Sequence, residues 1–353
     1  MVKLKPILRF LRQALVIFLI TFLLTEIAFR IYNHFYPSFI FYDPSYNQFR
    51  GRPNAPDYDF QLNSKGFKDV EFRTQTETGT QRILGLGDSF AFGVVPYRYN
   101  YLTLLEENLN LSGKKTEVIN MGIVGTGPRD YLALLVNEGL SLRPDVVLVS
   151  FFIGNDFETG NDPPRRFYSY SYVLSFIRYL IILRRGFQGQ VIHGIANYSD
   201  NGPGFPDAEF LKIESTRSEI YRKQNQKFES DFSVALGYLI QIKRICDERH
   251  IALTIVIIPD EVQVNRSLRS RVLQGKTDNS GAADFDFSLP NRRLTAKLRD
   301  EKIDYIDLLD AFAEASARTV LYRPNDSHWN IAGNRLAADL IGSHLLPAPQ
   351  PGK

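Results

Sequence analysis

The feature that most restricts the fold is the alternation of short apolar runs with amphipathic segments between residues 81 and 345. The apolar runs predict five strands, at Arg82–Leu86, Glu117–Asn120, Asp145–Phe152, Ile251–Ile258 and Ile303–Ile306. Helical periodicity predicts helices at Tyr101–Leu109, Arg129–Leu142, Ser230–Arg249, Asn291–Glu301 and Ile331–Leu345. Such alternation favours a parallel sheet covered by helices on both faces, a flavodoxin-like three-layer α/β domain. Ligands of such sheets bind beyond the carboxyl ends of the strands.

A candidate nucleophile follows the first predicted strand, in the sequence Gly87-Asp88-Ser89. A serine at a strand-to-helix turn exposes its hydroxyl at the sheet edge, and the N–H groups at the start of the helix can stabilise an oxyanion. A serine also needs a general base that is held by an acceptor. Among the five histidines, His328 has Asp326 two residues before it, in a loop that leads into the last helix. We therefore predict Ser89 as nucleophile, His328 as base and Asp326 as acid.

Two more strand ends carry hydrogen-bond donors. Gly125 follows the second predicted strand in the sequence NMGIVGTG, and Asn155 follows the third in GND. A glycine turn lets a backbone N–H approach a substrate, and an asparagine amide supplies another donor. Together with the N–H of Ser89, they predict an oxyanion hole of three donors.

These blocks resemble the SGNH/GDSL hydrolase family, whose pattern is a GDS serine, a glycine after the second strand, a GxND asparagine and a late Asp/His pair. The resemblance covers residues 81–345 and implies a triad of Ser89, His328 and Asp326 with Ser89, Gly125 and Asn155 as oxyanion donors. The apolar amino terminus, the sequence NSKGFKD and the sequence IPDEVQV are similar to membrane-tethered bacterial members. In the family the acid usually stands three residues before the histidine, where this chain has Asn325. We predict that Asp326, one residue nearer, takes its place.

The predicted chemistry is that of a serine esterase or O-acyltransferase, in which water or a sugar hydroxyl resolves an acyl-enzyme. We expect no cofactor, and no spacing typical of metal ligands occurs in the sequence. A dinucleotide-binding turn is the first alternative, although Phe90 replaces the third glycine of G-x-G-x-x-G. A catalytically inactive SGNH-like binding module in envelope polysaccharide assembly is the second, because a fold does not determine a function.

The amino terminus predicts a membrane anchor over residues 13–32. The sequence QALVIFLITFLLT carries no charge, Arg12 and Arg30 can reach opposite interfaces, and no A-x-A cleavage pattern follows. Four cations precede the span, at Lys3, Lys5, Arg9 and Arg12. They predict that residues 1–12 are cytoplasmic and that the domain faces the periplasmic side of the inner membrane. A signal peptide is the alternative. The expected substrate is an acyl ester, of an envelope polysaccharide or a lipid.

The charge of the chain argues against nucleic acid as a partner. The formal net charge is +3, from 42 basic and 39 acidic residues. Without the four amino-terminal cations, 38 basic residues stand against 39 acidic ones, a net charge of −1. Such a domain lacks the basic excess that binding to a phosphate backbone requires. The single cysteine, Cys246, cannot form an intramolecular disulfide.

Three further segments complete the predicted organisation. Residues 33–80 are rich in aromatics, Pro and Gly, and form a juxtamembrane extension. Residues 158–229 interrupt the alternation and are expected to lie over the strand ends as a lid-like insertion. Their apolar run Tyr172–Leu183 predicts an amphipathic helix that lies on the membrane, caps an acyl pocket or packs on the core. Residues 346–353 form a tail.

Overall fold

The computed structural model describes residues 4–35, 50–158, 171–185, 197–276 and 281–346. The chain divides into two compact units, one made of residues 1–44 and 162–187 and the other of residues 45–161 and 188–353. Parts of the predicted extension (36–49), of the insertion (159–170 and 186–196) and of the tail (347–353) lie outside the described residues. Each unit is described by itself below.

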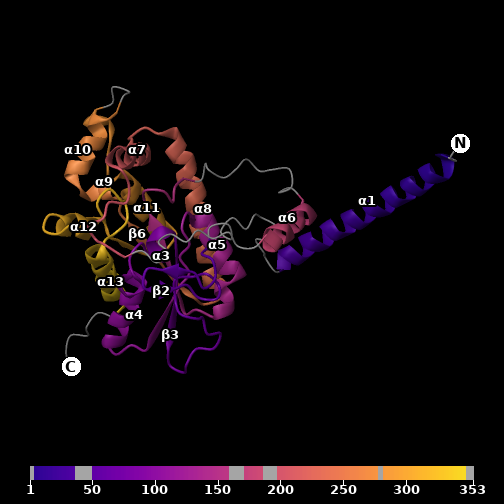
Figure 1. Cartoon of the computed structure of the whole chain (residues 1–353), viewed down its shortest axis with the longest axis horizontal. Helices are drawn as coiled ribbons and strands as arrows, with labels where there is room; N and C mark the ends of the chain where they lie inside the picture. The colour runs from indigo at the N-terminus through magenta and orange to yellow at the C-terminus, as the bar shows by residue number, and fades with distance from the viewer. Residues whose placement is uncertain (1–3, 36–49, 159–170, 186–196, 277–280, 347–353) are drawn as a thin grey trace. The chain divides into compact units, whose positions relative to one another are not determined.

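The larger unit is built on a five-stranded parallel sheet (Figure 1). Its strands, in spatial order, are β4 (Thr116–Asn120), β3 (Gln81–Gly87), β5 (Val146–Phe152), β6 (Ala252–Ile258) and β7 (Asp304–Asp307). Each strand begins and ends within one residue of its predicted bounds. The order reverses at β3, whose Gly85 pairs with Asn120 on one side and Leu148 on the other. The flavodoxin-like α/β fold is confirmed, and its switch point lies at the carboxyl end of β3.

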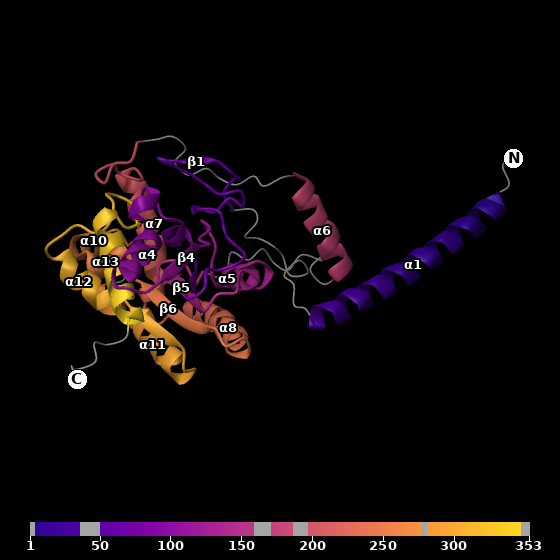
Figure 2. The ribbon, with the colours of Figure 1, turned by 90° about the horizontal axis from the view of Figure 1, so that it is seen from below.

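Helices cover both faces of this sheet (Figure 2). On one face α4 (Tyr101–Leu111) packs against α13 (Ile331–Leu345), and on the other α5 (Pro128–Asn137) packs against α8 (Gln226–Glu248). Helix α11 (Leu289–Asp300) packs against β7. The helix predicted over Arg129–Leu142 ends early, and a 3-10 turn (Gly139–Leu142) follows it. The chain comes so close to β3 here that a Cβ on Gly139 would lie 2.6 Å from Leu84.

The prediction lacks several shorter elements, which are too short or too polar for their pattern to be recognised. They are β1 (Pro56–Asp57), β2 (Phe60–Gln61), α3 (Ser89–Phe92), α7 (Asp207–Arg217), α9 (Glu261–Val264), α10 (Arg266–Gln274) and α12 (Leu309–Ser316), with 3-10 turns at Tyr97–Tyr99, Ser218–Tyr221 and Ala282–Asp284. Helix α7 buries only Phe210 and Glu214, and α10 only Leu268 and Val272. Helix α7 therefore has no apolar face that the sequence would reveal, and α10 has only nine residues.

The glycines before the candidate nucleophile have a packing role. A Cβ on Gly85 would lie 2.7 Å from Leu102 of α4, and one on Gly87 would lie 2.8 Å from Ala91 of α3. Glycine at both positions therefore lets two helices approach β3 closely. This accounts for the Gly-Leu-Gly sequence without a phosphate-binding role.

The described part of the extension, from residue 50 to residue 80, packs on the sheet unit. Its Phe60 stacks on Tyr97 with ring centroids 3.9 Å apart. Lys68 is buried, pairs with Asp57 at 2.6 Å and donates to the carbonyl oxygens of Gly93, at 2.8 Å, and Val95. This segment therefore holds the chain that leaves α3.

The smaller unit contains α1 (Leu4–Phe35) and α6 (Tyr172–Arg185). Within α1, Pro6–Tyr32 is long and apolar enough to cross a membrane. Its length and composition fit a membrane anchor and a signal sequence alike. The apolar run of the insertion forms α6, as predicted, and it lies beside the carboxyl-terminal end of α1 in both ribbon views.

Candidate active site

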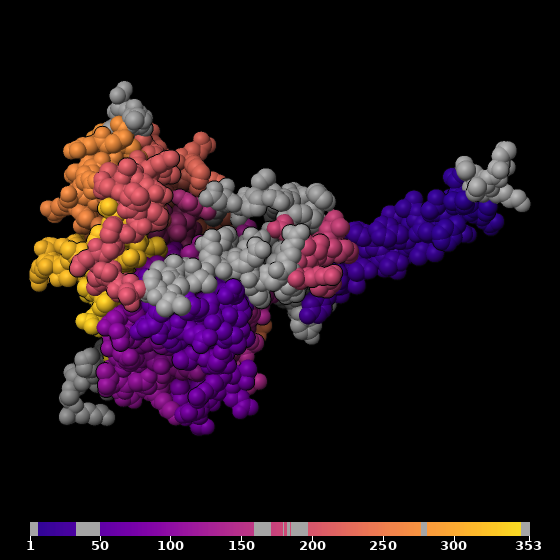
Figure 3. All heavy atoms as spheres, viewed as in Figure 1, coloured from indigo at the N-terminus to yellow at the C-terminus, as the bar shows by residue number. Residues whose placement is uncertain are grey.

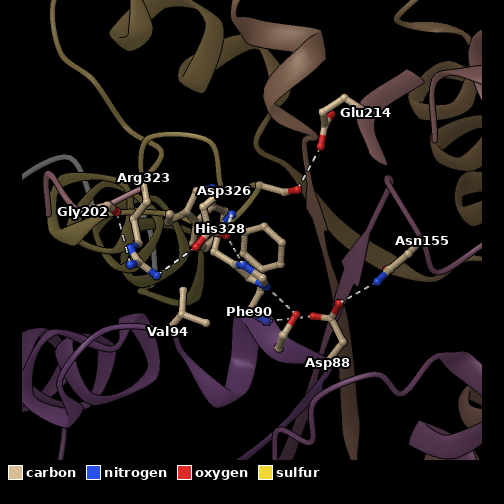
Figure 4. Close-up of polar contacts among 12 residues, drawn as sticks. Asp88, Phe90, Val94, Asn155, Gly202, Glu214, Arg323, Asp326 and His328 are labelled. Atoms are coloured by element: carbon tan, nitrogen blue, oxygen red, sulfur yellow. Dashed lines mark hydrogen bonds and ion pairs between the residues drawn. The ribbon is translucent and has the colours of Figure 1, made fainter. Parts of the chain in front are cut away.

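Ser89 is placed by the turn between β3 and α3. It is the first residue of α3, and Asp88 caps this helix by accepting a hydrogen bond from the N–H of Phe90 at 2.9 Å. Ser89 is 9% exposed, and its Oγ lies 2.7 Å from Nε2 of His328 (Figure 4). Helix α3 has only four residues, so its dipole is small, and the N–H groups at its start are the relevant donors.

His328 is in turn held by Asp326. Its Nδ1 lies 2.6 Å from Oδ1 of Asp326, and its backbone N–H donates to the same oxygen at 3.1 Å. The side chains of Ser89, His328 and Asp326 thus form one continuous chain of hydrogen bonds. Burial raises the pKa of Asp326, but the charges and hydrogen bonds of His328 and Arg323 lower it below its ordinary value. Asp326 is therefore a carboxylate at neutral pH, able to orient and stabilise a protonated imidazole.

A tight loop explains how an acid two residues before the histidine reaches it. Tyr322 and Trp329 form an antiparallel bridge, and the N–H of Arg323 donates to the carbonyl of His328 at 3.0 Å. Inside this closed loop Asn325 adopts a left-handed φ of 47°. Asparagine tolerates this conformation better than most residues. The turn at Asn325 places Asp326, not Asn325, beside the imidazole.

The second half of the insertion supports this loop. The N–H groups of Gly204 and Phe205 donate to the carbonyls of Pro324, at 3.0 Å, and Asn325, at 3.1 Å. A Cβ on Gly204 would lie 2.6 Å from Oδ2 of Asp326, so a side chain has no space there. In Figure 3 the pink residues of this segment cover part of the yellow carboxyl-terminal segment. This part of the insertion therefore packs against the loop of the acid.

Arg323 contacts the second oxygen of Asp326, and sequence reasoning missed this contact. Its guanidinium donates to Oδ2 of Asp326 at 2.9 Å and to the carbonyl of Gly202 at 3.5 Å, and it lies 5.7 Å from the ring centre of Tyr198 (Figure 4). The available signal was a cation three residues before the acid in the same loop. Arg323 therefore links the insertion to the carboxylate.

A buried polar network holds Ser327, the residue between the acid and the base. Its hydroxyl donates to Oε1 of Glu214 at 2.9 Å, and Arg217 donates to both Ser327 and Glu214. Burial raises the pKa of the Glu214 carboxyl well above its ordinary value. No pattern in the polar sequence of α7 indicated this contact, because the partners lie more than 100 residues apart.

The two predicted oxyanion donors outside α3 differ in their surroundings. Asn155 follows β5, and its Nδ2 donates to Oδ2 of Asp88 at 3.3 Å, which uses one of the two amide hydrogens. Gly125 lies in the turn after β4, is exposed and has a φ of 71°, which explains the glycine. In the same turn, a Cβ on Gly122 would lie 2.2 Å from the backbone nitrogen of Phe92 in α3. The role of Gly125 and Asn155 as oxyanion donors stays a prediction.

The other acids near the end of β7 are engaged elsewhere. Asp304 accepts from Thr254 at 2.7 Å and pairs with His344 at 2.9 Å, while Asp307 accepts from Asn291 at 2.9 Å. Among the described residues, no group of three or more His, Cys, Asp and Glu side chains is arranged to hold a metal ion. The described part of the site is thus a hydrogen-bonded arrangement of Ser89, His328 and Asp326.

Comparison with known proteins identifies the class. Residues 216–353 match the family model described as SGNH hydrolase-like domain, acetyltransferase AlgX. This match includes Asp326 and His328 and confirms the resemblance to the SGNH/GDSL hydrolases. The match covers the carboxyl-terminal part of the larger unit, whose five-stranded parallel sheet has an SGNH-like fold.

The solved structures that this chain resembles include esterases and a lipase/acylhydrolase. An acetyl xylan esterase, AlAXEase, is 19% identical over 75% of this chain and all of its own, with a TM-score of 0.42. A two-domain esterase active on acetylated mannans is 15% identical over 77% of this chain and 53% of its own, with a TM-score of 0.39. A lipase/acylhydrolase from Enterococcus faecalis is 17% identical over 75% of this chain and 95% of its own, with a TM-score of 0.37. Comparison with curated proteins gives no match.

Proposed function

We propose that this protein is a serine-dependent ester hydrolase or O-acyltransferase that acts on an acyl ester of an envelope glycan or lipid. The observation that carries the proposal is the continuous chain of hydrogen bonds from Ser89 through His328 to Asp326, at 2.7 and 2.6 Å. Such a chain activates a hydroxyl that is otherwise a weak nucleophile. The family description, an acetyltransferase, supports acetyl as the acyl group.

In the proposed mechanism, Oγ of Ser89 attacks the ester carbonyl while Nε2 of His328 takes the hydroxyl proton. Asp326 stabilises the imidazolium that forms. The carbonyl oxygen becomes an oxyanion, which the backbone N–H groups of Ser89 and Gly125 and the amide of Asn155 would stabilise. The tetrahedral intermediate then collapses, the ester C–O bond breaks, and His328 gives its proton to the departing alcohol.

The second half of the reaction distinguishes the two activities. His328 takes a proton from water or from a sugar hydroxyl, and the resulting oxygen nucleophile attacks the acyl group on Ser89. Water yields a free carboxylic acid, whereas a sugar hydroxyl yields a new ester. In both cases Ser89 recovers its proton from His328, and no cofactor is needed.

We also propose that α1 remains attached as an anchor in the inner membrane, with the domain on the periplasmic side. The four cations before the apolar run support this orientation, because positive residues favour the cytoplasmic side of a span. An anchored enzyme would meet envelope glycans or lipid esters at the membrane surface.

The test uses the full chain in detergent and a fluorophosphonate probe, which reacts with activated serines. We expect the wild type to be labelled and Ser89→Ala to be unlabelled. Ser343→Ala is the matched control, because Ser343 is an exposed helical serine whose hydroxyl donates to the carbonyl of Asp339 in the preceding turn. Equal labelling of wild type and Ser89→Ala would refute the proposal.

The same preparations, assayed with p-nitrophenyl esters of graded chain length, separate hydrolysis from transfer. Added unmodified oligosaccharide, as acceptor, will accelerate release of p-nitrophenol and yield acylated sugar if the enzyme is a transferase. If the sugar changes neither the rate of p-nitrophenol release nor the product, the enzyme is an esterase. A folded protein with neither labelling nor turnover would instead support an inactive binding module.

A further inference from the structure

The smaller unit contains an acid at an unusual place. Glu26 lies in the apolar helix α1, whose residues are otherwise mostly exposed, yet its side chain is only 12% exposed. An unpaired carboxylate at the edge of a membrane span is costly. Arg30, one turn later, pairs with Glu26 at 2.7 Å.

The remaining partners of Glu26 come from the start of α6. Its carboxylate accepts hydrogen bonds from the hydroxyl of Ser171 at 2.9 Å and from the backbone N–H groups of Tyr172 and Val173, each at 3.1 Å. These are N–H groups that a helix leaves without an internal partner. Glu26 therefore caps α6 from a different helix, with a favourable charge for the helix dipole.

Side-chain packing continues this contact along both helices. The rings of Phe29 and Phe176 lie 5.1 Å apart, and the guanidinium of Arg30 lies 4.7 Å from the ring centre of Tyr172. On α1 the less exposed positions are Phe22, Thr25, Glu26 and Phe29, which share one face at helical spacing. Helix α6 thus packs in a defined position against the carboxyl-terminal end of α1.

The neighbouring face of α6 is apolar and exposed. Ile177, Leu180 and Ile181 are each 47% exposed and recur at the spacing of one helical face. The sequence of α6, YVLSFIRYLIILRR, contains three arginines and no acid. An exposed aliphatic stripe together with cations is the composition of a helix that lies in a membrane interface rich in anionic lipids.

We propose that α6 is a second membrane-contacting element, seated in the lipid interface beside the end of α1 and held there by Glu26. The bilayer covers the exposed stripe of Ile177, Leu180 and Ile181. This stripe lies next to the face of α6 that packs on α1, and α1 exposes its own apolar side chains to the same lipid. The inference rests on the proposal that α1 stays attached as an anchor. The insertion would then fasten the chain to the membrane at two adjacent helices.

The test places an environment-sensitive fluorophore on α6. Leu180→Cys and the control Val234→Cys, an exposed apolar position on α8, are made in a Cys246→Ala background and labelled with a nitrobenzoxadiazole maleimide. The full chain is reconstituted into phosphatidylethanolamine/phosphatidylglycerol vesicles with or without brominated acyl chains. We expect at least about a twofold quenching by brominated lipid at position 180 and none at position 234.

Controls separate this proposal from the one on which it rests. Flotation of the labelled protein with vesicles reports the α1 anchor, so floating protein without quenching at position 180 overturns only the role of α6. Glu26→Leu keeps the span apolar but removes the cap, and should abolish most of the quenching without loss of flotation. Ile27→Leu, at the exposed neighbouring position, should leave the quenching unchanged.

Two other results would also overturn the proposal that α6 contacts the membrane. Energy transfer between labels on different copies, without lipid quenching, would show that the stripe binds a second copy of this chain. Ile177→Ser with Leu180→Ser would slow turnover of long acyl esters selectively if the stripe lined an acyl pocket. With the bilayer as occupant, this pair of substitutions reduces quenching and leaves the ratio of long-ester to acetate turnover unchanged.

Discussion

At the scale of single residues, the Asp-x-His spacing is possible because of the conformation of Asn325. Its left-handed φ of 47° turns the chain so that the next carboxylate meets Nδ1 of His328. Asn325 itself contributes its carbonyl to the contact with Phe205 of the insertion. Asn325, three residues before the histidine, thus forms a turn, and Asp326, one residue later, supplies the charge.

The first prediction compares these two residues. Asp326→Asn should lower kcat by about 10²- to 10⁴-fold, because a neutral amide cannot stabilise the imidazolium. Asn325→Gly should cost less than about tenfold, because glycine tolerates a positive φ and keeps the turn. Steady-state kinetics, with thermal unfolding to check folding, measure both. The opposite ranking would move the acid to another residue.

The second prediction concerns Arg323 as a positioning residue. Its guanidinium is one of the groups that lower the pKa of Asp326 against the effect of burial. In Arg323→Gln the pKa of Asp326 rises, so the carboxylate protonates at higher pH. The acid limb of the kcat profile should therefore move to higher pH, and kcat at neutral pH should fall about tenfold or more.

Arg318→Gln is the matched control for Arg323. Arg318 is an exposed arginine paired with Glu314 at 3.1 Å. The profile of kcat against pH for Arg318→Gln should coincide with that of the wild type. If kcat of Arg323→Gln falls by the same factor at every pH, and the acid limb does not move, Arg323 has a packing role only.

At the scale of elements, the segment before β3 is part of the domain that it precedes. Lys68 and Asp57 are 0% and 1% exposed, and Lys68 also binds the carbonyls of Gly93 and Val95. Burial lowers the pKa of Lys68, and the charge of Asp57 opposes this effect. The pair therefore joins the β1–β2 hairpin to the chain that leaves α3.

The third prediction follows from this buried pair. Lys68→Met should lower the free energy of unfolding by about 3–5 kcal/mol, because it leaves the Asp57 carboxylate buried without its counter-ion. Lys68→Met with Asp57→Leu should recover part of that loss. Urea denaturation measures both, with the exposed Lys65→Met as control. A double variant no more stable than Lys68→Met would contradict this account.

At the scale of the whole molecule, the chain joins a helical unit that contains α1 and α6 to an α/β unit with an SGNH-like fold. The insertion contributes to both. Its residues 171–185 pack on α1, whereas its residues from 197 onward hold the loop of Asp326. One segment therefore supplies both the partner helix of α1 and the support of the Asp326 loop.

The fourth prediction concerns topology. Protease added to intact spheroplasts should digest the domain, because the amino-terminal cations favour the cytoplasmic side. A cytoplasmic marker protein should survive the same treatment and be digested only after lysis. Protection of the domain, or a soluble product beginning near Tyr32, would contradict an uncleaved anchor with an external domain.

The sequence by itself determined the strands, the sheet class and the candidate Ser89 and His328. The reason is that buried parallel strands are continuous apolar runs, that Ser89 directly follows one of them after Asp88, and that His328 has an acid two residues before it. The same local patterns predicted α6 and the apolar span.

Only the tertiary structure decided which residues support the site. Arg323, Glu214 and Gly204 contact the loop of the acid through hydrogen bonds and close packing between distant segments, which no local periodicity records. The same holds for Glu26, which looks like an interruption of an apolar helix until α6 supplies its partners. A polar group in a sequence shows that it needs a partner, and the partner is chosen when the chain folds.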